Sequence, residues 1–195
     1  MLYINQEDYL HVHYNQQRAT GKADEAGCNV AKAGCGLCCV CMLIDHLTEE
    51  SLSVEDCVDL AEKSDANLYV GTNMRIFAPV VAEKFGLKYS TTNDTEQLVR
   101  HLQSGGEAIV HVANKPSGER GIFTIGGHYM LLLSTDGETL RFFDPHYDEK
   151  RYHEWGTDQL VKKEGNFLYC SIPLMDRETQ NREVHYYLFS KEYKK

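Results

Sequence analysis

The hydrophobic positions of this 195-residue chain change their spacing about halfway along the sequence. In 53–64, 73–86 and 94–106, apolar residues recur every three to four positions, as in helices with one buried face. After residue 106, short segments rich in β-branched and aromatic residues follow, and turn residues bound them. The predicted strands are 107–113, 126–134, 139–144, 166–174 and 184–190. A helical first half and a stranded second half predict an α+β fold.

The segment 35–47, CGLCCVCMLIDHL, differs from the other predicted helices because it has no charged residue before Asp45. A helix that is apolar on nearly all sides lies in a core. We therefore expect a buried helix in the N-terminal half, packed on the antiparallel sheet of the C-terminal half. The flanks of the other helices carry caps: Ser53 and either Asp94 or Thr95 at N-termini, and Gly86 at a C-terminus.

Composition narrows the classes of function. Charged residues make up 25% and hydrophobic residues 42%, which suits one globular domain spanning 1–195. The net charge of -9 argues against a nucleic-acid partner, because phosphate binding requires clustered Lys and Arg. No basic and apolar leader opens the chain and no apolar run approaches membrane-spanning length. The sequence predicts a soluble cytoplasmic protein, or a secreted one if a leader has been removed, with no membrane partner; it leaves the oligomeric state open.

Four of the seven cysteines fall within seven residues: Cys35, Cys38, Cys39 and Cys41. Adjacent Cys38 and Cys39 and an odd total argue against a disulfide framework, so buried thiols are the default. Cys35 stands between two glycines at the predicted start of the helix, where backbone N–H groups favour a thiolate. At such positions the pKa of a thiol can fall from about 8.5 into the range of roughly 3.5 to 7.5. The other three lie within the helix.

A thiolate nucleophile needs a base, and the hairpin predicted over 126–144 offers one. His128 follows a Gly-Gly pair at the start of a strand, and Asp144 ends the next strand. A three-residue loop over 135–137, or an equivalent bulge, places the two side chains on one face and directly opposite each other. A two-residue loop would place them on opposite faces. We predict the first arrangement, with Cys35 as nucleophile, His128 as base and then acid, and Asp144 as the group that orients the imidazole.

Three stretches of the sequence resemble the papain-like cysteine peptidases that remove double-glycine leaders from bacteriocins, and most of all the stand-alone relatives of that family. The stretches are AGCGLCCVCMLI, EKFGLKYSTTNDTEQLVRHLQSGGEAIVHV and GIFTIGGHYMLLLSTDGETLRFFDP. The resemblance covers about 12–148, with 149–195 completing the fold. It implies a papain-like fold, a peptide or protein substrate, and the same roles for Cys35, His128 and Asp144.

The family also uses a glutamine upstream of the nucleophile to complete its oxyanion hole. The resemblance implies Gln16 in this role, with Gln17 beside it as the alternative. Asn29 has the papain-type spacing, six residues before Cys35, but is a different residue type.

Three other functions remain open from sequence. The first is a Cys-rich metal-binding protein that draws on Cys28 and the helix, although structural zinc sites usually take paired cysteines from separate turns. The second is an inactive binding module on the same scaffold. The third is an acyltransferase related to transglutaminases, because transfer to an amine shares the thioester intermediate. The peptidase or amidase interpretation is preferred, and it requires no cofactor and no metal.

Overall fold

The structure of the protein is a computed structural model. It describes residues 1–14, 29–68, 71–115, 117–153 and 159–192. The chain divides into two compact units, Met1–Lys88 with Lys191–Lys195, and Tyr89–Ser190. The prediction that the whole chain is one domain stays a prediction.

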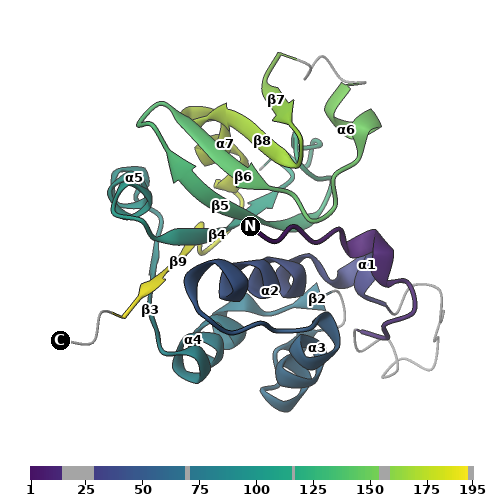
Figure 1. Ribbon diagram of the computed structural model, residues 1–195. Coiled ribbons are helices and arrows are strands. Elements are labelled where there is room, and N and C mark those ends of the chain that lie inside the picture. The colour runs from purple at the N-terminus through teal and green to yellow at the C-terminus, as the bar shows by residue number, and fades with distance from the viewer. Residues whose placement is uncertain (15–28, 69–70, 116, 154–158, 193–195) are drawn as a thin grey trace. The chain divides into compact units, whose positions relative to one another are not determined.

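The first unit is mainly helical (Figure 1). Its elements are the 3-10 helix η1 (Gln6–Tyr9), helices α1 (Val30–Ala33), α2 (Cys35–Leu47), α3 (Val54–Lys63) and α4 (Met74–Phe85), and the strand pair β1 (Asn67–Leu68) and β2 (Gly71–Thr72). Helix α2 contacts α1, α3, α4 and β2. Ten of its thirteen residues are buried, which confirms the helix that is apolar on nearly all sides.

The predicted caps explain where the helices begin and end. The side chain of Ser53 accepts a hydrogen bond from the backbone N–H of Asp56 at the start of α3. Gly86 ends α4 in the left-handed conformation, with φ 62°, which a glycine adopts without steric cost. Between the two possible caps of the third predicted helix, the structure selects Asp94, which accepts from the N–H of Glu96. Local capping chemistry thus sets these boundaries.

The second unit is built on a sheet (Figure 1). Its elements are β3 (Leu87–Thr92), α5 (Thr95–Gln103), β4 (Glu107–Ala113), β5 (Gly127–Thr135), β6 (Thr139–Phe143), α6 (Glu149–His153), β7 (Val161–Glu164), β8 (Phe167–Ser171), α7 (Ile172–Thr179) and β9 (Tyr186–Lys191). The seven strands lie in the order β3-β9-β4-β5-β6-β8-β7. The pairs from β9 to β7 are antiparallel, which confirms the α+β class.

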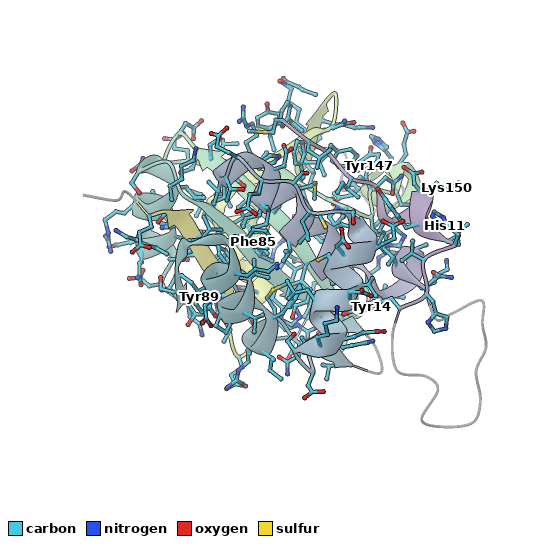
Figure 2. All side chains as sticks on the ribbon, turned by 60° about the horizontal axis from the view of Figure 1, so that its bottom comes forward. His11, Tyr14, Phe85, Tyr89, Tyr147 and Lys150 are labelled. Atoms are coloured by element: carbon cyan, nitrogen blue, oxygen red, sulfur yellow. The ribbon has the colours of Figure 1, made fainter. Side chains whose placement is uncertain are left out.

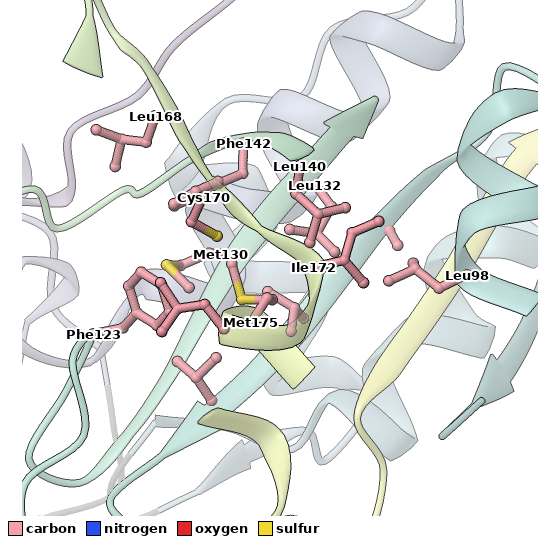
Figure 3. Packing of buried hydrophobic residues seen from close by; sticks show 14 of the residues in the cluster. Leu98, Phe123, Met130, Leu132, Leu140, Phe142, Leu168, Cys170, Ile172 and Met175 are labelled. Carbon is pink, nitrogen blue, oxygen red and sulfur yellow. The ribbon is translucent and has the colours of Figure 1, made fainter. Parts of the chain in front are cut away.

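A hydrophobic core packs within this unit. It joins one face of β4, β5, β6 and β8 to apolar residues of α5 and α7. Figure 3 labels ten of its members: Leu98, Phe123, Met130, Leu132, Leu140, Phe142, Leu168, Cys170, Ile172 and Met175. Burial of these apolar side chains stabilises β5 and β6, at whose ends the base and acid candidates lie.

One sequence prediction about the C-terminal quarter is wrong. The strand predicted to run to Leu174 ends at Ser171, and helix α7 begins at Ile172 with a proline in its first turn. Proline is well suited to a first helical turn because its missing N–H has no partner there. Residues 149–195, expected to complete the fold, contribute α6 and β7 ahead of this strand.

The loop predicted to join β5 and β6 is also wrong. Residues 136–138 form the connection instead of 135–137, and Thr135 pairs with Leu140. The side chain of Thr135 accepts from Gly137 and donates to the carbonyl of Thr139, which holds the turn. Continued along both strands, this register would put the base and acid candidates on opposite faces.

A β-bulge at Leu133 corrects the register, so that Leu131 pairs with Phe143 beyond it. The extra residue returns His128 and Asp144 to the same face of the hairpin, which confirms the prediction of a shared face. They are offset by two positions, however, rather than directly opposite. The predicted bulge, and not the predicted loop, provides the pairing.

None of the helices formed by the described residues has both the length and the apolar character needed to cross a membrane.

Candidate functional site

The candidate nucleophile lies at a break between two helices. Helix α1 ends at Ala33, Gly34 is the N-cap of α2, and Cys35 is the first residue of α2. The backbone N–H of Gly34 donates to the carbonyl of Val30, at 2.7 Å, and closes α1. The first turn of α2 contains no acidic residue, so no carboxylate of that turn competes for the positive end of the helix. The predicted position of Cys35 at a helix start is therefore confirmed.

Gly34 is required here for steric reasons. A Cβ atom at this position would lie 2.3 Å from Cγ1 and 2.6 Å from the carbonyl oxygen of Val30. Any other residue would push α1 and α2 apart or rotate one against the other. The glycine before Cys35 thus sets the angle at which the second helix begins.

The neighbouring cysteines have a different environment. Cys38, Cys39 and Cys41 are fully buried within α2, whereas Cys35 is half-buried. Burial, followed by the charges of Cys41 and Cys35, raises the pKa of the Cys38 thiol well above its usual 9.0. The cysteines in the described residues are thiols rather than disulfides, as predicted. Placement at the end of α2 distinguishes Cys35 from the cysteines that fill its interior.

The candidate base and its carboxylate meet in the second unit. His128 is the second residue of β5, and its Nε2 lies 2.6 Å from Oδ1 of Asp144, directly after β6. The two side chains are buried, with relative exposures of 6% and 0%. Because Nε2 faces the carboxylate, Nδ1 is the ring nitrogen that can take a proton from a nucleophile. The predicted contact is confirmed; the catalytic roles stay predictions.

Asp144 is ionised despite its burial. Burial alone would raise its pKa, but the charge and hydrogen bond of His128, the hydrogen bond from Tyr152 and the charge of Arg151 lower it to about 2. The Tyr152 hydroxyl donates to Oδ2 at 2.7 Å, and the backbone N–H of His146 donates to Oδ1 at 2.8 Å. A fixed anion beside an imidazole stabilises the imidazolium and holds the ring in one orientation.

Arg182 secures the backbone that leads into His128. Its guanidinium donates to the carbonyl of Gly126 at 3.1 Å and to that of Val112, the residue paired with His128, at 3.4 Å. A Cβ atom on Gly127 would lie 2.5 Å from Nη2 of Arg182. The second glycine of the Gly-Gly pair therefore makes room for the arginine.

A second histidine lies near this backbone but has a different character. The ring of His111 stacks on Tyr129, with centroids 4.2 Å apart. Burial, then the positive charges of Arg182 and His128, lower its pKa from 6.5 to about 3. His111 is therefore neutral at physiological pH, whereas His128 faces a buried carboxylate.

Sequence reasoning missed Arg151, Tyr152 and Arg182. Arg151 donates to the carbonyl of Phe123 at 3.0 Å and lies 3.9 Å from Asp144. For Tyr152 the sequence contained a signal: it is the one apolar position in the charged run DEKRYHE, which favours an inward-facing side chain. Arg182 carried no such signal, because its partners are backbone carbonyls distant in the sequence.

The structure describes only one of the three residues considered for the oxyanion hole. Gln16, its alternative Gln17, and Cys28 of the metal alternative lie outside the described residues. Asn29 is the N-cap of α1, and its Oδ1 accepts from the backbone N–H of Lys32 at 3.1 Å. Within 1–14, 29–68, 71–115, 117–153 and 159–192, no group of three or more His, Cys, Asp or Glu side chains is placed to hold a metal ion.

Comparisons with known proteins support the fold. No family model and no curated protein matches the sequence. The structure is similar to a putative C39-like peptidase from Bacillus anthracis, with TM-score 0.56 and 12% identity over 83% of this chain and 90% of that one. It also aligns with UfSP from C. elegans, with TM-score 0.41 and 16% identity over 93% of this chain and 32% of that one. The chain thus shares the papain-like fold of cysteine peptidases.

Proposed function

We propose that the protein is a cysteine peptidase or amidase of the papain-like type, in which Cys35 is the nucleophile, His128 the base and Asp144 the orienting acid. The observation that carries the proposal is the buried hydrogen bond of 2.6 Å between His128 Nε2 and Asp144 Oδ1. The position of Cys35 at the start of α2 and the shared fold support it. In this proposal the whole chain is one catalytic domain.

The reaction would proceed in two halves. The Cys35 thiolate attacks the amide carbonyl, and the oxyanion is stabilised by the Cys35 N–H at the helix start and by the side chain of Gln16. His128 gives its proton to the leaving amine, and a thioester forms. His128 then takes a proton from water, which hydrolyses the thioester and releases the acid and the thiol. Side chains, one backbone N–H and a water molecule thus supply each proposed step, and the proposed substrate is a peptide or protein.

The test is alkylation with iodoacetamide over a series of pH values, with each cysteine mapped by mass spectrometry. We expect Cys35 to react fastest near neutral pH, and its rate to fall sharply in His128→Ala. His153→Ala is the matched control, because the side chain of this histidine is exposed, with its Nε2 3.9 Å from Oε1 of Glu149.

Equal labelling of several cysteines, or labelling of Cys35 that His128→Ala leaves unchanged, would contradict the proposal. Release of an amine from a peptide library, with the acid as the other product, would establish hydrolysis. Transfer of the acyl group to an added amine would instead show an acyltransferase on the same residues.

A further inference from the structure

The residue that the catalytic assignment leaves unused is Tyr152, whose buried hydroxyl donates to the carboxylate of Asp144. We propose that Tyr152 is a positioning residue: its hydroxyl fixes the plane of the Asp144 carboxylate and thereby holds the His128 ring with the proton on Nε2. The catalytic part of this inference rests on the proposed function. The geometric part concerns the second unit alone and is testable without activity.

The two oxygens of the carboxylate are held from different segments. Oδ1 accepts from Nε2 of His128 at 2.6 Å and from the backbone N–H of His146 at 2.8 Å. Oδ2 accepts from the hydroxyl of Tyr152 at 2.7 Å, whereas the nearest guanidinium nitrogen of Arg151 lies 3.9 Å away, beyond hydrogen-bond distance. Tyr152 therefore makes a short contact at Oδ2 that opposes rotation of the carboxylate about its Cβ–Cγ bond.

Tyr152 is held rigidly enough to act as such a stop. Its ring stacks on Tyr147, labelled in Figure 2, with centroids 5.1 Å apart and planes 15° from parallel. The ammonium of Lys163 lies 4.0 Å from the centre of the Tyr147 ring, and Phe123 packs against Tyr152 at 6.1 Å. Aromatic stacking and the cation–π contact fix the ring from several sides. The hydroxyl consequently has little freedom except along its bond to Asp144.

The hydroxyl remains a donor wherever the carboxylate is ionised. Burial, then the negative charge of Asp144, raise the pKa of Tyr152 well above its usual 10.0. A protonated phenol facing an ionised carboxylate has one way to form the bond: it donates. The direction of this hydrogen bond matters because a hydrogen-bond acceptor in place of the Tyr152 hydroxyl would repel the Asp144 carboxylate. The ring of His128 would then lose its partner.

The experiment uses Tyr152→Phe, which keeps the stacked ring and removes only the hydroxyl. Tyr147→Phe is the matched control, because it makes the same chemical change on the adjacent ring of the stack. The readouts are the ¹H and ¹⁵N resonances of the His128 ring, which report where the proton lies, and kcat and KM on the best substrate.

We expect wild type and Tyr147→Phe to show one Nε2–H proton of His128, shifted downfield and slow to exchange. Tyr152→Phe should broaden or lose this resonance and move the ring nitrogens toward a mixture of tautomers. It should lower kcat about tenfold, the equivalent of one hydrogen bond to a charged group, with KM unchanged. A purely structural role would lower the melting temperature and leave the His128 resonances of the folded protein in place.

Two failures are distinguishable. Unchanged His128 resonances in folded Tyr152→Phe overturn the inference, whatever happens to activity. Altered resonances in a protein with no thiol reactivity at Cys35 would support the positioning role and sink the proposed function. If the tyrosine variant unfolds, Arg151→Met provides the second test: removal of the distant cation should leave the Nε2–H resonance intact, and its loss would mean that Arg151, not Tyr152, fixes the carboxylate.

Discussion

The start of α2 and the end of the β5–β6 hairpin prepare their candidate groups by different means. At Cys35 the environment is made by backbone: a helix break, a glycine without space for a Cβ atom, and the N–H groups of a first turn. At His128 it is made by side chains: a buried carboxylate, a tyrosine hydroxyl and two arginines. Backbone features follow from local sequence, whereas the side-chain network depends on residues far apart in the chain.

The two regions also differ in how they hold charge. The first turn of α2 has no acidic side chain, so partial charges of the helix act on the thiol. The hairpin end instead buries a full negative charge and balances it with hydrogen bonds and cations. The helix start buries no full charge, so it tolerates exposure to solvent. The hairpin end would keep an unpaired buried charge if one partner were lost, so its stability is more sensitive to mutation.

The largest expected effect comes from the nucleophile. Cys35→Ala should reduce amide hydrolysis by about 10³-fold or more, because no thioester can form. Cys38→Ala is the control three residues along the same helix; its buried, protonated thiol should be dispensable, and activity should stay within about threefold. Hydrolysis measured with a fluorogenic peptide checks both. Activity of Cys35→Ala comparable to that of wild type would show that the cysteine at the helix start does not differ in function from those in the helix interior.

The next effect probes the network at the hairpin. Asp144→Asn keeps the size of the side chain and removes its charge, so the imidazolium of His128 loses its counter-ion. We expect kcat to fall by about 10²- to 10⁴-fold while KM changes little. Asp148→Asn, a nearby exposed carboxylate, is the matched control. If both variants behave alike, the buried hydrogen bond does not contribute to catalysis.

Sequence patterns predicted the backbone features well and the network poorly. The buried helix, the helix start at Cys35, the capped helices and the shared face of His128 and Asp144 all follow from spacing, glycines and turn residues, and the structure confirms them. Each depends on residues close together in the chain or on the period of a strand, so the information is local. Their joint catalytic role remains a proposal.

The remaining features depend on register and on distant partners. The turn pairs Thr135 with Leu140, and the bulge at Leu133 restores the predicted face. A bulge adds one residue to one strand and changes the pattern of hydrophobic positions very little. Tyr152 and Arg182 reach Asp144 and Gly126 across gaps of 8 and 56 residues. Contacts of this kind emerge only when tertiary packing has fixed which side chains meet.

A third prediction tests the backbone region through stability. Gly34→Ala should lower the free energy of unfolding by about 2 kcal/mol, because the new methyl group would overlap backbone atoms of Val30 that cannot rotate away. Gly126→Ala is the control, since nothing lies within 4 Å of a Cβ atom there, and it should be neutral or slightly stabilising. Urea unfolding of both variants provides the comparison. A neutral Gly34→Ala would mean that the helix break does not depend on this glycine.

The fourth prediction concerns acid. The folded-state pKa of Asp144, about 2, lies below its usual 3.8, so ionisation stabilises the fold above pH 4. That contribution, about 2 kcal/mol, is lost as the pH falls from about 4 toward 2. Urea unfolding at pH 5, 4 and 3 should show wild type losing more stability than Asp144→Asn over this interval. Parallel losses in the two proteins would contradict a depressed pKa.

The smallest effect tests whether Arg182 secures the backbone before His128. In Gly127→Ala the new methyl group would displace the arginine, whose flexible side chain moves away and gives up its hydrogen bond to the carbonyl of Gly126. We expect a loss of about 1 kcal/mol in stability, the net value of one such bond. A double-mutant cycle with Arg182→Ala measures the coupling.

In the Arg182→Ala background the Gly127→Ala change should cost nothing, because the atom it displaces is gone. Additive losses would instead assign the cost to the backbone of Gly127 itself. The same cycle read out through the alkylation rate of Cys35 separates support from catalysis. If Arg182 holds His128 in place, both single variants should slow alkylation of Cys35 to the same extent, and the double variant should slow it no further. That result would extend the side-chain network from the carboxylate of Asp144 to the backbone on the other side of the histidine.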